Sequence, residues 1–299
     1  MATTTSITTS YAGEKLQGFI SAALLSANTI ENGGVTVKPN VKFKQVIKKL
    51  STNDLVADGT CDFDATSTVT LTERYLEPKE FQVNLQLCKQ DFRDDWDAIS
   101  MGMSAHDSIP PAFSDYLLGH VVSKVAEKIE NTIFGGADAV AGEFDGFIAL
   151  AAADADVVDV AGTTIDASNV IAELGKVVDA IPTTVYGQED LSVYISPSTA
   201  RAYIRAQAAL GYKDLYHVGQ TALDFEGVKL FVSNGMPADK MIAAQSGNLM
   251  YGTGLLNDKN VAKVIDMADI DGSQNVRIVL RYTATVNFGI GSEIVLYSA

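Results

Sequence analysis

The sequence contains few of the residues that carry metal or redox chemistry. Of its 299 residues, two are cysteine and three are histidine. Cys61 and Cys88 stand 27 positions apart (88 − 61), so they form neither a CxxC pair nor a cysteine–histidine cluster. Two free thiols in a reducing cytosol are favoured over a single disulfide. No metal site is predicted.

Motifs of catalysis are also missing. The sequence has no GxSxG, HExxH or P-loop. The Gly-x-Gly sequences at 252–254 and 289–291 lack the third glycine and the following helix of a dinucleotide loop. The acidic run from Asp266 to Gly272 does not fit the register of a calcium loop, and it indicates a solvated turn. We therefore predict no catalytic residue, no cofactor and no enzymatic activity.

Basic residues are scarce. Lysine and arginine number 22 against 37 aspartates and glutamates, which gives a formal net charge of −15. This charge disfavours a protein that wraps nucleic acid by counterion release. The start of the chain has no basic residues before an apolar core, so a secretory signal is not expected. The apolar stretch at 19–25 is shorter than the roughly 20 residues that span a bilayer. The sequence predicts a soluble protein without a membrane partner.

Hydrophobic residues make up 47% of the chain, as in globular proteins, and a long β-hairpin is predicted near the start. Extended runs at 42–48 and 69–76 flank a polar segment that contains the turn signal Asp58-Gly59. The tip of the hairpin is expected near residues 54–59. Residues 81–88 then alternate between apolar and polar side chains, which predicts a further strand.

Helices are indicated by apolar residues that recur every three or four positions. The clearest helix covers residues 112–134, is about 33 Å long, and ends at Gly135-Gly136. A second helix covers 170–181, with Asp166 as its expected cap. Ser196-Pro197 begins a third helix, with serine as its cap and proline in its first turn.

The clearest strand is near the end of the chain. Residues 276–290 alternate over fifteen positions, which is long for a strand. Residues 294–297 are expected to form a short partner for it. Shorter strands are predicted at 191–195, 228–232, 240–244 and 261–265.

A basic cluster stands out in this acidic chain. Five lysines lie within twelve residues: Lys38, Lys42, Lys44, Lys48 and Lys49. Lysines on an exposed strand edge discourage unwanted strand pairing. Alternatively, they form a positive surface that meets the acidic surface of another copy. Direct binding of DNA is a third, weaker alternative.

The order of the elements resembles that of a known family. An N-terminal arm precedes a long hairpin, a strand and a long helix, and a region of short strands and helices follows. The segments that carry the resemblance are 130–136 (ENTIFGG), 142–148 (GEFDGFI), 193–199 (VYISPST), 225–234 (FEGVKLFVSN) and Met236-Pro237. This order resembles the major capsid proteins of tailed double-stranded DNA bacteriophages, with the Hong Kong 97-type fold.

The resemblance implies an α+β fold with five segments. These are an N-terminal arm (1–36), an extended loop with an adjoining peripheral strand (37–90), a peripheral domain with a spine helix (91–145), an axial domain (146–265), and return strands of the peripheral domain (266–299). The hairpin would lie across a neighbouring subunit. Its candidate contact residues are Lys42, Lys44, Lys48, Lys49, Asp54 and Asp58.

The implied function is self-assembly into hexamers and pentamers that form an icosahedral head shell around double-stranded DNA. The implied partners are copies of the chain, portal, scaffolding and cement proteins, and packaged DNA bound without sequence specificity. The implied location is the virion, assembled in the bacterial cytoplasm. A net charge of −15 suits a wall that repels packaged DNA.

Three other interpretations of the sequence remain open. An encapsulin-type shell would enclose enzymes instead of DNA. A soluble α+β enzyme with an unrecognised site would form a small oligomer and have a pocket with shifted titratable groups. A tail or surface-layer component fits the order of the elements less well.

Overall fold

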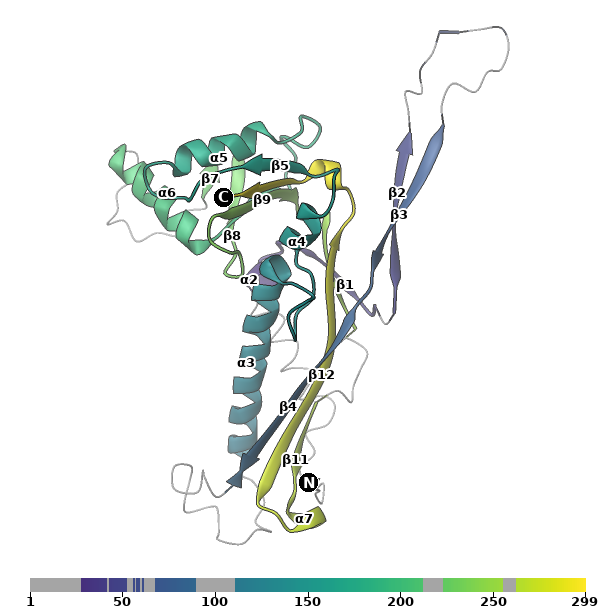
Figure 1. Cartoon of the computed structure of the whole chain (residues 1–299), viewed down its shortest axis with the longest axis vertical. Helices are drawn as coiled ribbons and strands as arrows, with labels where there is room; N and C mark the ends of the chain where they lie inside the picture. The colour runs from purple at the N-terminus through teal and green to yellow at the C-terminus, as the bar shows by residue number, and fades with distance from the viewer. Residues whose placement is uncertain are drawn as a thin grey trace.

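Long elements and a projecting hairpin dominate the fold (Figure 1). The computed structural model describes residues 28–41, 43–52, 56, 58–59, 61, 68–89, 111–211, 223–254 and 262–299. At one end, a six-stranded sheet is covered by helices. A long helix and long strands run from there to the other end, and the hairpin points away from the body.

A five-stranded sheet forms the elongated part of the body. Its longest strand, β12 (Asn275–Phe288), pairs antiparallel with β4 (Lys79–Cys88), β10 (Leu249–Thr253) and β11 (Ala262–Asp266). Strand β1 (Thr36–Pro39) pairs parallel with β10. The predicted alternation of the last long strand is confirmed, because every second residue from 276 to 288 is buried.

The spine helix α3 (Pro111–Gly135) packs beside this sheet. It confirms the helix predicted at 112–134. Its buried stripe consists of Leu117, Leu118, Val121, Val122, Ala126, Ile129 and Ile133. The helix ends where Gly136 closely approaches the loop that follows, since a Cβ atom there would lie 2.4 Å from the carbonyl oxygen of Phe144.

The second sheet is buried on both faces. Its strands are, in spatial order, β5 (Val158–Ala161), β13 (Val295–Ser298), β9 (Lys240–Gln245), β6 (Leu191–Ile195), β8 (Val228–Val232) and β7 (Asp224–Phe225). Helices α5 (Val170–Asp179) and α6 (Pro197–Ala209) cover one face. The end of α3 and helix α4 (Phe147–Ala152) cover the other. Burial on both faces explains why β6 is apolar without alternation.

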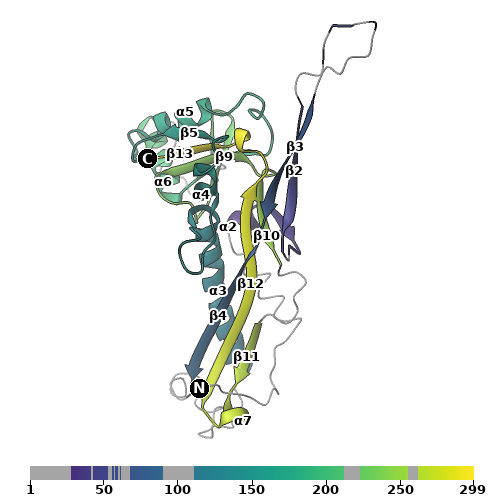
Figure 2. The same ribbon diagram turned by 45° about the vertical axis from the view of Figure 1, so that its right-hand side comes forward.

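The predicted hairpin is confirmed. Strands β2 (Gln45–Thr52) and β3 (Val69–Leu76) pair antiparallel from Gln45–Leu76 to Thr52–Val69 and project from the body (Figure 2). Half of the expected tip lies outside the described residues, although Asp58 is described and exposed.

One sequence-based pairing of a strand is wrong. Residues 294–297 were expected to pair with the last long strand, but β13 instead joins the six-stranded sheet between β5 and β9. Val295, Leu296 and Tyr297 are all buried, which suits a strand covered on both faces. Strands β10 and β11 belong to the five-stranded sheet, although the expected axial segment extended to residue 265. The chain therefore crosses between the two sheets before and after β12.

The caps of two helices and the state of the two cysteines were also predicted from the sequence. The cap of α5 is Asn169, while Asp166 accepts hydrogen bonds from the N–H groups of Ser168 and Asn169 in the preceding turn. Ser196 caps α6 as predicted, accepting from the N–H of Thr199. Cys61 and Cys88 are both free.

The start of the described chain is a short helix, α2 (Asn28–Glu31), that ends at the turn Asn32-Gly33-Gly34. Gly33 has a φ of +70°, a conformation that glycine adopts without strain. Apolar residues recur with helical spacing at 14–27, and the short helix that they predict lies outside the described residues. Two of the three histidines, His106 and His217, also lie outside them. Within the described ranges, no helix is long and apolar enough to cross a membrane.

Candidate assembly surface

The projecting hairpin has an exposed apolar face. Residues directly opposite each other in an antiparallel pair share a face. Val46 lies opposite Tyr75, and Leu50 lies opposite Leu71. Val69 follows on the same face because strand side chains alternate. We call Val46, Leu50, Val69, Leu71 and Tyr75 the outer hairpin face.

The outer hairpin face is strongly exposed in the single chain. Leu50 is 64% exposed and Leu71 is 62% exposed. One pair of opposite charges, Lys48 across from Glu73, interrupts the apolar row. Contiguous exposed apolar residues of this kind mark surfaces that another protein covers. On a two-stranded ribbon they also invite uncontrolled association unless a defined partner is present.

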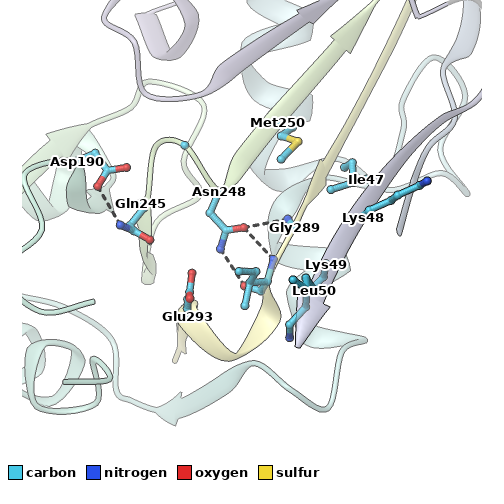
Figure 3. Close-up of a pocket in the computed structure, with 12 residues that line it drawn as sticks. Ile47, Lys48, Lys49, Leu50, Asp190, Gln245, Asn248, Met250, Gly289 and Glu293 are labelled. Carbon is cyan, nitrogen blue, oxygen red and sulfur yellow. Dashed lines mark hydrogen bonds between the residues drawn. The ribbon is translucent and has the colours of Figure 1, made fainter. Parts of the chain in front are cut away.

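The inner face of the hairpin is turned toward the body. Leu76, at its base, is buried and packs against Gly252 of β10. Farther out, Ile47, Lys48, Lys49 and Leu50 line one wall of a groove of about 370 Å³ (Figure 3). The opposite wall comes from the ends of strands in both sheets, so the groove separates the hairpin from the body.

One amide side chain, that of Asn248, binds the backbone in the body wall of this groove. Asn248 accepts hydrogen bonds from the N–H groups of Gly289 (2.9 Å) and Ile290 (2.8 Å) through its Oδ1. Its Nδ2 donates to the carbonyl of Ile290 (2.8 Å). Asp190 and Glu293 lie on the same wall, across the groove from Lys48 and Lys49 (Figure 3).

The structure does not gather the predicted contact lysines into one patch. Lys44 lies at the base, 3.6 Å from the carboxylate of Glu77 and 3.8 Å from the centre of the Tyr75 ring. Lys48 and Lys49 line the groove. Of the other candidates, Asp58 is exposed, while Lys42 and Asp54 lie outside the described residues.

Lys38 is separate from these lysines, because it pairs with Gly252 within the five-stranded sheet. Sequence analysis also missed the outer hairpin face. Its signal was present, because apolar residues recur at every second position from 69 to 75, interrupted at Glu73.

A second apolar surface lies between α3 and β4. The lining of a groove of about 430 Å³ includes Lys124, Lys128 and His120. Its apolar side chains are Phe81, Val83, Leu85, Val121, Val125 and Tyr282. Both lysines already have acidic partners, Glu127 for Lys124 and Glu143 for Lys128. The groove is therefore an apolar surface more than a charged one.

A buried carboxylate joins three distant segments. Glu130, in the spine helix, is 5% exposed. It accepts hydrogen bonds from the Thr29 hydroxyl (2.6 Å), the Thr29 N–H (3.2 Å) and the Ser233 hydroxyl (3.1 Å). These contacts tie the start of the described chain and the end of β8 to the spine helix. Sequence reasoning did not find this role, because Glu130 stands close to the charged residues Glu127 and Lys128 in the same helix.

Replacing Glu130 with alanine is expected to lower the free energy of unfolding by about 2 kcal/mol or more, because three buried donors lose their acceptor. Denaturant unfolding measures this loss. The matched control is Glu127→Ala, one turn away and exposed, which is expected to cause no measurable change. Equal stability of the two variants would contradict the role of Glu130.

In the part of the chain that the structure describes, no group of three or more His, Cys, Asp or Glu side chains could hold a metal ion. The acidic run from Asp266 to Gly272, expected as a solvated turn, contains a short helix. Asp266 pairs with the buried Lys89, and Gly272, with a φ of +69°, ends the short helix α7 (Ala268–Asp271).

Comparison with solved structures identifies the fold. No protein-family model matches the sequence, and no curated protein is similar to it. The capsid of an empty GTA particle superposes with a TM-score of 0.65 at 14% identity, covering 92% of this chain and 90% of that one.

Two further capsid structures agree. The satellite phage P4 procapsid matches with a TM-score of 0.55 at 11% identity, over 94% of this chain and 98% of that one. The capsid of Myoviridae phage XM1 matches with a TM-score of 0.55 at 12% identity, over 91% and 92%. In each case the similarity covers more than nine-tenths of this chain. The chain therefore has the α+β Hong Kong 97-type capsid fold.

Proposed function

We propose that the chain is a major capsid protein, a structural subunit that assembles into the head shell of a tailed bacteriophage. The observation that carries the proposal is the outer hairpin face, a row of exposed apolar side chains on an element that projects from the body. Burial of that face against another copy would stabilise the assembled state of a chain with this fold. The similarity to capsids over nine-tenths of the chain supports a shell role instead of an enzymatic one.

The proposed contact is heterologous, because the outer hairpin face and its acceptor are different surfaces. The groove between α3 and β4 is our candidate acceptor, since its floor is apolar and open. Contacts between two different surfaces generate rings when the rotation between copies closes. Rings of six and five subunits would be the hexamers and pentamers of an icosahedral shell.

The proposed partners follow from the same role. Packaged double-stranded DNA would face an acidic chain of net charge −15, which repels it and lets it coil freely. Portal, scaffolding and cement proteins would bind the shell during or after assembly in the bacterial cytoplasm. The finished protein would reside in the virion.

The contents of purified particles test this function. Particles would be isolated from cells that express the chain from its native locus, treated with nuclease, and then opened. We expect double-stranded DNA that survives the nuclease because the shell encloses it. An enclosed enzyme without DNA would instead identify an encapsulin-type shell, and a small oligomer without a shell would favour a soluble enzyme.

A further inference from the structure

One arginine of the hairpin reaches three parts of the body. Arg74 lies on the inner face of β3 and forms an ion pair with Asp154, which follows α4. Its guanidinium carbon lies 4.5 Å from the centre of the Phe288 ring at the end of β12. Gly291 lies beside both charged groups. Arg74 therefore links the hairpin to the ends of both sheets.

The ion pair is shielded from solvent on both sides. The side chain of Arg74 is 29% exposed, and that of Asp154 is 16% exposed. Oδ1 of Asp154 accepts a hydrogen bond from the Asp156 N–H (3.0 Å), and Oδ2 accepts from Arg74. Burial raises the pKa of Asp154, but these hydrogen bonds and the charges of Arg74 and Lys49 outweigh it, so the pKa is lowered. Asp154 thus stays ionised, and the pair persists at neutral pH.

A glycine makes room for the pair. A Cβ atom at Gly291 would lie 3.0 Å from Oδ2 of Asp154 and 3.3 Å from Nη2 of Arg74. These distances are shorter than ordinary van der Waals contacts, so a larger residue would push the charged groups aside. The chain has the one residue type here that lets the backbone approach both of them.

The ion pair also lies farther from the base of the hairpin than its other described contacts with the body. Closer to the base, Leu76 is buried, and Asn287 donates to the Tyr75 carbonyl (2.7 Å). Among the described residues, Arg74–Asp154 is the ion pair that joins a hairpin strand to the body. Beyond it, the groove separates β2 from the body.

We infer that Arg74 is a positioning residue, whose ion pair with Asp154 fixes the angle at which the hairpin leaves the body. Five residues of strand separate Arg74 from Val69, a span of about 17 Å at 3.3 Å per residue. A rotation of about 10° at Arg74 would therefore displace Val69 by about 3 Å. That displacement is large for an interface that must repeat around a ring. The effect of this angle on the shell rests on the proposed function, whereas the link between the ion pair and the angle does not.

Distances between two spin labels test this inference in solution. The labels are placed at Ser51→Cys in β2 and Ala172→Cys in α5, two exposed positions, in a chain with Cys61→Ser and Cys88→Ala. The chain also carries Leu71→Asp, which we expect to keep it unassembled. We expect one narrow distance distribution with Arg74 intact. Ser51 lies opposite Thr70, four positions from Arg74, so Arg74→Gln is expected to shift or broaden the distribution by about 2 Å or more.

Two controls separate positioning from a general loss of structure. The charge exchange Arg74→Asp with Asp154→Arg is expected to restore the narrow distribution. Arg281→Gln removes an exposed pair with Glu80 and is expected to leave the distribution unchanged. An unchanged distribution in Arg74→Gln would overturn the inference. A changed distribution in Arg74→Gln, together with failure of the chain with its native Leu71 to form shells, would contradict the proposed function and leave the inference standing.

Discussion

Replacing Leu71 with aspartate is expected to abolish assembly and to leave the folded chain intact. Leu71 is 62% exposed in the single chain, so the change removes no packing from the core. In an assembled interface the new carboxylate would be buried without a partner, which costs several kcal/mol. Since about 1.4 kcal/mol is a factor of ten, the concentration needed for assembly should rise by about 100-fold or more.

Light scattering and electron microscopy measure this effect, and circular dichroism reports whether the chain is folded. The matched control is Thr70→Asp, a charge added at the neighbouring exposed position on the other face of β3. It is expected to assemble at nearly the same concentration as the unaltered chain. Normal shells from Leu71→Asp would show that the outer hairpin face is not buried on assembly.

Replacing Phe134 with alanine is expected to lower the free energy of unfolding by about 3–5 kcal/mol. Phe134 is fully buried at the end of the spine helix. Its ring centre lies 5.8 Å from that of Phe147 and 5.6 Å from that of Tyr194 in the six-stranded sheet. The ring therefore belongs to the core shared by the two sheets, and a cavity there weakens their connection.

Denaturant unfolding of the unassembled Leu71→Asp chain measures this loss without a contribution from neighbouring subunits. The matched control is Phe43→Ala, because Phe43 is 86% exposed and its ring contributes little to the core. We expect the control to unfold at the same denaturant concentration as its parent. A loss below about 1 kcal/mol for Phe134→Ala would contradict a tightly packed shared core.

Local periodicity predicts much of this fold. The spine helix and the long strand β12 each carry a regular apolar pattern over many residues, so their type and bounds were predictable. The hairpin followed from two extended runs with a turn signal between them. The element order supported the resemblance to phage capsid proteins, which comparison with solved structures bears out at the level of the fold.

Pairing between distant segments was not predictable in the same way. Residues 294–297 form a continuous apolar run, and such a run fits the centre of either sheet. The choice of β5 and β9 as partners depends on how the chain turns after Phe288, which periodicity does not encode. The Arg74–Asp154 pair joins residues 80 positions apart and leaves no local pattern.

The hairpin lysines show that closeness in the sequence does not predict a single surface patch. Lys44, Lys48 and Lys49 are close in the sequence and read as one basic cluster. In the structure, Lys44 contacts Glu77 and Tyr75 at the base, while the other two lie along the groove. Alternation in a strand separates neighbouring residues onto opposite faces. Their contacts with another subunit remain a prediction.

Direct observation of the purified chain tests the central claim. The chain would be expressed alone, separated by size-exclusion chromatography and imaged by cryo-electron microscopy over a range of protein and salt concentrations. We expect closed shells or rings of five and six subunits, with the outer hairpin face of each copy covered by its neighbour. Rings or shells in which every hairpin projects freely into solvent, or a chain that stays monomeric under all of these conditions, would contradict it.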